Sequence, residues 1–204
     1  MRIAFCGPRG TGKTTLADYL VKLHGFTRCS LAAPIKRIIA EAPQDSHERH
    51  QFLWRWAEEL FPGRFMLQAR FATEAGRLFV TEKDPGRRAQ QLGTDIGRAL
   101  DPEVWIRYLL EHLPAGPVAV DDVRFPNECD RLRDAGFTLI RLVAPADVLA
   151  ARLAARPGER RDPSHVSEHA LEELPDEYFD AVWDTSEPLE ATVARLRQIV
   201  DRGR

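Results

Sequence analysis

The sequence of 204 residues has no apolar run approaching the ~20 residues that a membrane-spanning helix requires. It has only three cysteines, Cys6, Cys29 and Cys129, which lie far apart and show no CxxC spacing. It also has no excess of one charge, because the formal net charge is −2, which argues against a general nucleic-acid or membrane-surface binder. We therefore expect a reduced, cytoplasmic protein that binds neither nucleic acid nor membrane.

Lysine is scarce as well. Lys13, Lys22, Lys36 and Lys83 are the only lysines among 29 basic residues, so a lysine inside a motif is informative. The composition, 44% hydrophobic and 29% charged, is that of an ordinary globular protein, and the length fits one core. We expect a single domain over residues 1–204.

Short apolar segments alternate with segments of helical periodicity along most of the chain. The predicted strands are residues 3–6, 26–31, 117–123, 137–143 and 181–183. The predicted helices are residues 14–23, 34–39, 90–100, 103–113, 127–135, 147–155 and 189–200. This alternation predicts an α/β fold, a five-stranded parallel sheet with helices on both faces.

Residues 41–84 interrupt the alternation, because they contain no clear strand. Large apolar residues recur there at three- and four-residue steps: Phe52, Leu53, Trp56, Leu60, Phe61 and Phe65. We interpret the segment as a helical insertion. These residues would form an apolar stripe along one helix face. The stripe either lines a binding cleft or, more simply, packs against the body of the protein.

One motif carries specific chemistry. Residues 7–14, GPRGTGKT, match G-x-x-x-x-G-K-[ST] and lie between the first predicted strand and helix. Backbone N–H groups of such a loop converge on phosphate oxygens, and the helix N-terminus adds partial positive charge. Lys13 is expected to reach the β- and γ-phosphates, and the Thr14 hydroxyl to ligate Mg²⁺. The cofactor-binding residues predicted here are Gly7, Arg9, Gly10, Thr11, Gly12, Lys13, Thr14 and Thr15.

The motif predicts a P-loop NTPase that uses ATP and Mg²⁺. ATP is favoured over GTP because the sequence has no NKxD-like guanine motif. A metal held by Thr14 needs an acidic partner at the end of a neighbouring strand, and Asp121 and Asp122 end the strand at 117–123. We favour Asp122 as the residue that assists the metal, because an informative sequence follows it. The alternative for either residue is a turn or helix cap.

Residues 122–128, with the sequence DVRFPNE, resemble a motif of the phage-type deoxynucleoside monophosphate kinases, a family of P-loop nucleotide kinases. Three further segments are similar to motifs of that family, in the same order: LAAPIK at 31–36, QQLGTD at 90–95 with Arg98, and HVSE at 165–168. Together they span about residues 3–170. The sequence departs from the family in having Leu31 for an aromatic residue and Asp184 where asparagine is common.

The resemblance implies transfer of the ATP γ-phosphoryl group to a deoxynucleoside monophosphate (dNMP), giving dNDP and ADP. It implies a helical acceptor-binding region at 33–100, and an Arg-, Pro- and Gly-rich lid at 152–168. The implied substrate-binding residues are Lys36, Arg87, Arg88, Gln90, Thr94, Arg98, Asp122, Arg124, Asn127 and Glu128. The implied catalytic residues are Lys13, Arg124 and the lid arginines Arg152, Arg156 and Arg160, with Arg161 beside them. The partners are small-molecule nucleotides, the chain is a monomer or homodimer, and a phage-encoded protein would act in the host cytoplasm.

Three alternatives remain at this stage. One is a kinase for another small phosphorylated acceptor, such as phosphomevalonate or dephospho-coenzyme A. Another is a P-loop ATPase that drives a partner macromolecule. The third is a zinc peptidase, since His165–His169 fits H-x-x-E-H, although a third zinc ligand is not evident downstream.

Overall fold

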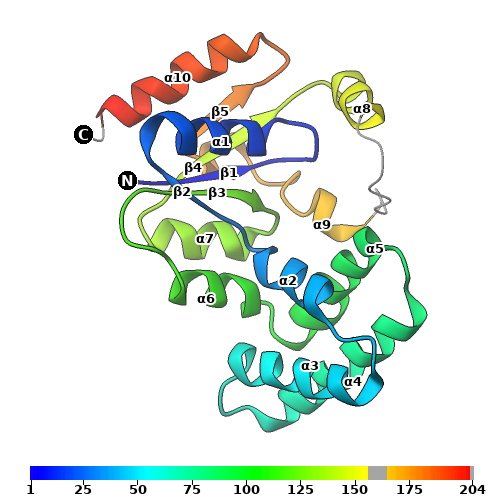
Figure 1. The fold of residues 1–204 in the computed structure, drawn as a ribbon. Coiled ribbons are helices and arrows are strands. Elements are labelled where there is room, and N and C mark those ends of the chain that lie inside the picture. Colours follow the sequence, from blue (N-terminus) through cyan, green and yellow to red (C-terminus); the bar gives the residue numbers. More distant parts are fainter. Residues whose placement is uncertain (156–164, 203–204) are drawn as a thin grey trace. The chain divides into compact units, whose positions relative to one another are not determined.

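The computed structural model describes residues 1–155 and 165–202, which fall into two compact units (Figure 1). The first unit comprises Met1–Ser30 and, among the described residues, 112–155 and 165–202. The second unit is Leu31–Glu111, which contains the predicted acceptor-binding region 33–100.

The first unit is built on a five-stranded sheet in the order β2-β3-β1-β4-β5, and every neighbouring pair is parallel. The strands are Arg2–Cys6 (β1), Thr27–Cys29 (β2), Val118–Val123 (β3), Thr138–Val143 (β4) and Ala181–Asp184 (β5). The central strand β1 is almost wholly buried, as expected for a parallel strand covered on both faces. The predicted fold is confirmed, although β2 is shorter than the predicted 26–31.

Helices cover both faces of this sheet (Figure 1). Helices α1 and α10 lie on one face and α7 lies on the other. The α1/α10 face holds the main core, where Phe5, Leu16, Leu20, Trp183 and Leu196 are buried together. The helical elements of this unit are Lys13–His24 (α1), Pro126–Asp134 (α7), Ala146–Ala154 (α8), Val166–His169 (α9), the 3₁₀ turn Asp176–Tyr178 (η2) and Leu189–Arg202 (α10).

On the α7 face, two thiols meet. The Sγ atoms of Cys6 in β1 and Cys129 in α7 are 3.8 Å apart, and both residues are fully buried. The hydrogen bond between them, together with burial, raises the pKa of Cys6 well above its usual value. These thiols therefore pack as small apolar groups. Cys29 is half-buried, and all three cysteines are free thiols.

The second unit is helical throughout its length. Its elements are Ala33–Glu41 (α2), Ser46–Leu60 (α3), Phe65–Thr81 (α4), Pro85–Gln90 (α5), the π-helix Gln91–Arg98 (η1) and Val104–Glu111 (α6). The predicted apolar stripe forms the core of the unit rather than an open face, because Leu53, Trp56, Leu60 and Phe61 are all buried. Two residues of the stripe are exceptions: Phe52 is half-buried, and Phe65 has 65% of its surface exposed.

One predicted helix differs in kind. Residues 90–100 were expected to form an α-helix, but α5 ends at Gln90 and the chain continues as a π-helix to Arg98. Glycines at 93 and 97 lower the helix propensity of this segment, and neighbouring side chains pack directly against both. Among the described residues, no helix is both long and apolar enough to cross a membrane.

Candidate active site

The loop between β1 and α1 has the backbone of a phosphate-binding loop. Gly7, Gly10 and Gly12 all have positive φ, at 121°, 86° and 89°. At Gly7 a side chain is also sterically impossible without rearrangement, because a Cβ would lie 2.2 Å from the Leu142 carbonyl oxygen. These three positions therefore require glycine, and they lead directly into the N-terminus of α1, which favours anions.

Lys13, the first residue of α1, turns back over this loop. Its Nζ donates hydrogen bonds to the carbonyl oxygens of Gly7 and Pro8, each at 2.7 Å, and only 6% of the residue is exposed. The hydroxyl of fully buried Thr11 donates to the same Pro8 carbonyl at 2.8 Å. The ammonium group is thus held at the mouth of the loop, where a phosphate would compete for it.

The hydroxyl and carboxylate expected at a magnesium site are together, but the carboxylate is not the predicted one. The Thr14 hydroxyl donates to Asp121 Oδ2 at 2.7 Å, whereas Asp122 accepts from the Ser30 hydroxyl at 2.6 Å. Alternate residues of a strand point to opposite sides, so only one of two adjacent aspartates can meet Thr14. The carboxylate in contact with Thr14 is therefore Asp121, whereas the assignment of the metal to Asp122 stays a prediction. Hydroxyl and carboxylate oxygens are suitable ligands for Mg²⁺, or partners of its waters.

A cation from β2 completes this cluster. Arg28 Nε lies 3.2 Å from Asp121 Oδ2, and Arg28 Nη1 lies 2.8 Å from Asp18 of α1. Asp121 is 4% exposed, and a carboxylate at that depth needs hydrogen-bonding and charged partners such as these to offset the cost of its burial. Sequence reasoning missed Arg28. Its signal, a charged residue in a strand beside two aspartates, becomes visible only once β2 is known to neighbour β3.

The DVRFPNE segment forms the turn from β3 into α7. Glu128, only 3% exposed, accepts hydrogen bonds from the backbone N–H groups of Arg124 at 2.8 Å and Phe125 at 3.0 Å. This carboxylate therefore caps the start of α7, a structural use that differs from the substrate contact predicted for it. Arg124 and Asn127 are half-buried, and Tyr178 donates to the Pro126 carbonyl at 3.2 Å, which fixes the turn from outside.

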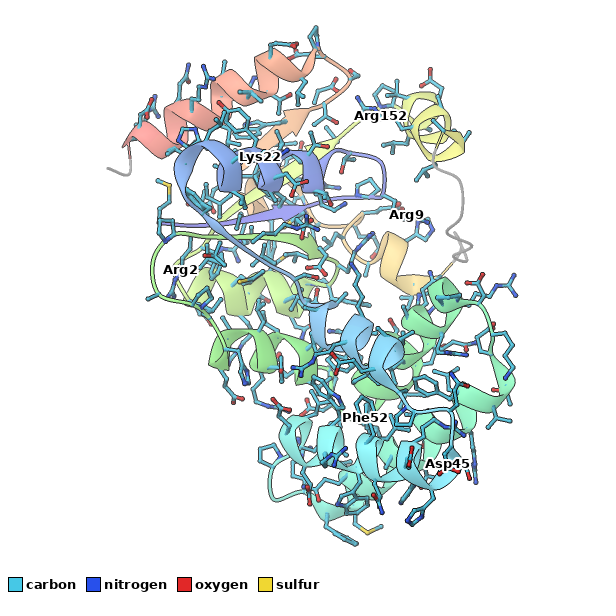
Figure 2. All side chains as sticks on the ribbon, viewed as in Figure 1. Arg2, Arg9, Lys22, Asp45, Phe52 and Arg152 are labelled. Atoms are coloured by element: carbon cyan, nitrogen blue, oxygen red, sulfur yellow. The ribbon has the colours of Figure 1, made fainter. Side chains whose placement is uncertain are left out.

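Arg152 of α8 contacts the phosphate loop. Its Nη1 donates to the Gly10 carbonyl at 3.1 Å, and its Nη2 to the Thr185 carbonyl at 2.5 Å. Figure 2 shows Arg152 and Arg9 on the side of the first unit that carries the phosphate loop and α8. Of the predicted lid arginines, Arg156, Arg160 and Arg161 lie outside the described residues.

Asp184, the departure from the family pattern, is exposed and lies just before Thr185. It accepts from the Ser186 N–H at 2.8 Å, which, with further hydrogen bonding to Ser186, lowers the pKa of its carboxyl. Asp184 therefore orders the backbone of the turn between β5 and α10.

The remaining predicted acceptor residues lie in the second unit, on α2, α5 and η1. Lys36 and Arg87 are exposed, Thr94 and Arg98 are half-buried, and Gln90 is buried. Arg98 donates to the Pro102 carbonyl at 2.8 Å. Arg88 already has partners within the unit: its Nε donates to the Glu82 carbonyl at 3.1 Å, and its guanidinium lies 4.6 Å from the Phe79 ring centre.

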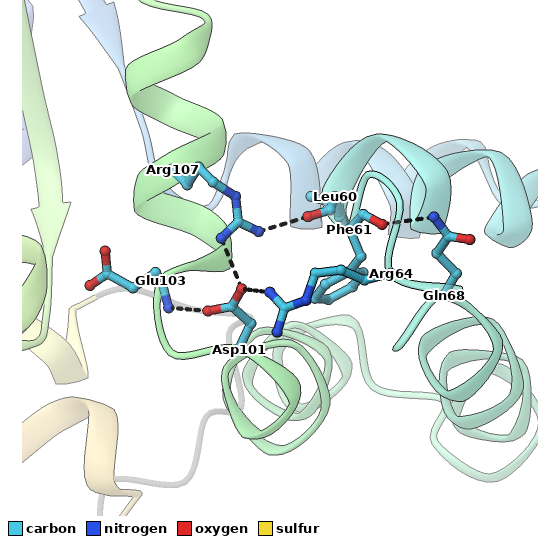
Figure 3. Close-up of polar contacts among 7 residues, drawn as sticks. All are labelled: Leu60, Phe61, Arg64, Gln68, Asp101, Glu103 and Arg107. Atoms are coloured by element: carbon cyan, nitrogen blue, oxygen red, sulfur yellow. Dashed lines mark hydrogen bonds and ion pairs between the residues drawn. The ribbon is translucent and has the colours of Figure 1, made fainter. Parts of the chain in front are cut away.

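A buried ion cluster holds the second unit together (Figure 3). Asp101 Oδ2 accepts from Arg64 Nη1 at 2.6 Å and Arg107 Nη1 at 2.8 Å, while Oδ1 accepts from the Glu103 N–H at 3.0 Å. Arg107 also donates to the Leu60 carbonyl at 2.8 Å. The cluster thus ties the end of α3 and the start of α4 to the turn before α6. Nothing in the sequence motifs indicated it.

The zinc alternative finds no support in the described part of the chain. His169 Nδ1 pairs with Glu172 at 2.8 Å, across one turn of the chain. Among the described side chains, which do not include Glu168, no group of three His, Cys, Asp or Glu residues is arranged to hold a metal ion.

Comparison with known proteins agrees with this geometry. A family model described as “AAA domain” matches residues 3–180. A protein of Acanthamoeba polyphaga mimivirus named “Putative deoxynucleotide monophosphate kinase” is 28% identical over 214 residues, covering 98% of this chain and 95% of that protein.

Two solved structures share the fold. Shikimate kinase from Bacteroides thetaiotaomicron aligns with a TM-score of 0.53 at 17% identity, covering 98% of both chains. A sugar kinase from Janibacter sp. HTCC2649 aligns with a TM-score of 0.50 at 18% identity, covering 98% of this chain and 94% of the other. At these identities the likeness concerns the fold, which is that of P-loop kinases.

Proposed function

This chain belongs to the AAA domain family, and from that membership and its P-loop kinase fold we propose that it is a nucleoside monophosphate kinase. The proposed reaction transfers the γ-phosphoryl group of ATP to a dNMP, giving dNDP and ADP. The observation that carries phosphoryl transfer is the arrangement of Lys13, Thr14 and Asp121 around the glycine loop. The acceptor class is supported by the DVRFPNE segment and by the full-length similarity to the mimivirus protein.

The loop would bind the triphosphate through its backbone N–H groups and Lys13. Lys13 would exchange the carbonyls of Gly7 and Pro8 for phosphate oxygens, and so move from a structural to a catalytic contact. Magnesium bound with ATP supplies neutralisation of the β- and γ-phosphate oxygens. Thr14 would hold that ion, with Asp121 orienting the Thr14 hydroxyl.

The acceptor needs no general base, because a phosphate monoester with a second pKa near ~6 is already largely ionised at neutral pH. The protein must instead hold two polyanions in line and neutralise their charge, which guanidinium groups do well. Arg124 and Arg98 remain our candidates for the acceptor phosphate. Arg152 would stabilise the loop through Gly10, and the lid arginines at 156 and 160 would contact the transferring group.

A coupled ADP-release assay tests the proposal. The acceptors are each common dNMP and NMP, phosphomevalonate, dephospho-coenzyme A and shikimate. We expect turnover with at least one dNMP and none with the last three. Turnover with only a non-nucleotide acceptor would support a kinase activity but refute a nucleotide as its acceptor. ATP hydrolysis stimulated by DNA or protein but by no small acceptor would refute the kinase and favour the partner-driven ATPase.

A further inference from the structure

The π-helix η1 has a buried side and a more exposed side. Leu92, Gly93, Ile96 and Gly97 are buried, whereas Thr94, Asp95 and Arg98 are half-buried or exposed. Single π-helical turns are rare and are found often at functional sites, since they change which side chains share a face. The contacts on the buried side therefore decide where Thr94 and Arg98 are presented.

Both glycines of η1 are covered by side chains that leave no room for a Cβ. At Gly97 a Cβ would lie 2.4 Å from the Trp105 ring, and at Gly93 it would lie 2.9 Å from Cδ1 of Ile35. The backbone of η1 is therefore in direct contact with α6, which carries Trp105, and with α2, which carries Ile35.

Trp105 adds a hydrogen bond to this packing. Its Nε1 donates to the Gly93 carbonyl at 2.7 Å, and the residue is only 3% exposed. One side chain thus contacts η1 at two points a turn apart, through its ring at Gly97 and its N–H at Gly93. If the N–H is removed, the protein has a buried carbonyl with one partner fewer, which favours a different backbone path.

We propose that Trp105 is a positioning residue for the acceptor nucleotide, which acts through η1 on Thr94 and Arg98. This inference rests on the proposed function, in which η1 belongs to the acceptor site. Trp105 itself is buried behind the helix, so its effect is on the placement of residues that bind rather than on binding.

The test compares two identical substitutions in the same unit. Trp105→Phe removes the N–H that reaches Gly93, and Trp54→Phe removes an N–H that donates to Glu58 Oε1 at 3.0 Å on the surface of α3. For Trp105→Phe we expect the acceptor KM to rise about tenfold, equivalent to about 1.4 kcal/mol of acceptor binding, with the KM for ATP unchanged. Trp54→Phe should leave both values unchanged.

A second pair of variants tests the same packing of η1 even if the Trp105→Phe variant does not fold. Gly93→Ala pushes a methyl group toward Ile35 Cδ1, and adding Ile35→Val removes that carbon atom. The single substitution should raise the acceptor KM, and the double substitution should restore it. Leu53→Ala serves as the structural control, because it opens the core of the same unit away from η1 and should lower the unfolding temperature without changing the acceptor KM.

The outcomes separate the two proposals. If the wild-type chain turns over no nucleoside monophosphate, the proposed function fails and the inference fails with it. If the wild-type chain is active but Trp105→Phe and Gly93→Ala leave the acceptor KM unchanged, the inference alone is wrong. It is also wrong if Leu53→Ala raises the acceptor KM as much as Trp105→Phe does, because the effect would then be one of stability.

Discussion

Replacing Asp101 by asparagine should destabilise the second unit measurably. The variant retains an oxygen that can accept from the Glu103 N–H, but it places an amide N–H₂ or a neutral oxygen before Arg64 and Arg107. The substitution therefore removes two charge-assisted contacts while changing the volume of the side chain very little.

The size of the effect follows from the exposure of each partner. The Arg107 side chain is 27% exposed, so its contact with nearly buried Asp101 should contribute about 1.5 to 2 kcal/mol. The Arg64 side chain is 50% exposed and can turn to water, which limits its contact to about 0.5 to 1 kcal/mol. The sum, about 2 to 3 kcal/mol, corresponds to a fall of about 5 to 10 °C in the unfolding midpoint of a chain this long.

The effect should also depend on pH. Burial raises the pKa of Asp101, but the hydrogen bonds from Arg107, the Glu103 N–H and Arg64 lower it by more than burial raises it. The pKa of Asp101 is therefore below its ordinary value. A carboxyl with a lowered folded-state pKa stabilises the fold above its unfolded pKa of about 3.9, and this contribution is lost as pH falls through the folded pKa. The difference between wild type and variant should therefore be constant from about pH 7 to 5 and shrink in stronger acid.

Urea unfolding followed by circular dichroism and by tryptophan fluorescence, at several pH values, measures this difference. Glu41→Gln is the matched control, because it breaks the exposed Arg37–Glu41 pair in the same unit and should cost less than about 0.5 kcal/mol. An Asp101→Asn variant as stable as Glu41→Gln would refute the reasoning. So would a difference that does not diminish in acid.

Three further predictions concern the first unit. Lys13→Ala should reduce turnover by at least about a hundredfold while the protein stays folded, since it removes the cation at the phosphate loop; ADP release and thermal unfolding check this. Asp121→Asn should lower kcat and raise the Mg²⁺ requirement more than Asp122→Asn, because the Thr14 hydroxyl donates to Asp121 and not to Asp122; equal effects in a Mg²⁺ titration would contradict this expectation. Burial and the hydrogen bond to Asp130 raise the pKa of Tyr178 to about 12. In a pH titration of the wild type, the phenolate absorbance of Tyr178 should therefore appear only near that pH, and this component should be missing in Tyr178→Phe.

The phosphate loop was predictable because its information is local. Three glycines with positive φ, one lysine and two threonines occupy eight consecutive residues, and the flanking strand and helix are evident from periodicity. Most of the strands were predictable for a similar reason, since they are short apolar runs bounded by turn residues, although β2, with the sequence TRC, is polar and mostly exposed. Neither conclusion needed knowledge of the tertiary structure.

The carboxylate that contacts Thr14 was not predictable in this way. Whether Asp121 or Asp122 meets Thr14 depends on which face of β3 is covered by α1, and the motif does not contain that information. Asp121 is in phase with Ala119, which lies in the core cluster with Leu16 of α1, so alternation along β3 places Asp121 beside Thr14. The sequence motif drew attention to Asp122 instead.

The π-helix and the Asp101 cluster depend on tertiary contacts as well. Over eight residues, the periodicity of a π-helix is hard to distinguish from that of an α-helix, and η1 is set apart by packing from Trp105 and Ile35. Asp101 and its partner Arg64 are 37 residues apart in the chain. The sequence indicated that arginines would bind phosphate groups. Its composition could not show which arginines instead form ion pairs within the protein.

The burial of two of the three thiols has a practical consequence. Cys6 and Cys129 are closed to solvent, which leaves half-buried Cys29 as the residue that a maleimide reaches first. Burial, and after it the charge of Asp122, raise the pKa of Cys29, so labelling proceeds best in mildly alkaline buffer. A fluorophore attached there stands next to Arg28, whose guanidinium contacts Asp121, so the unmodified sequence already provides a spectroscopic reporter close to the proposed metal and phosphate site.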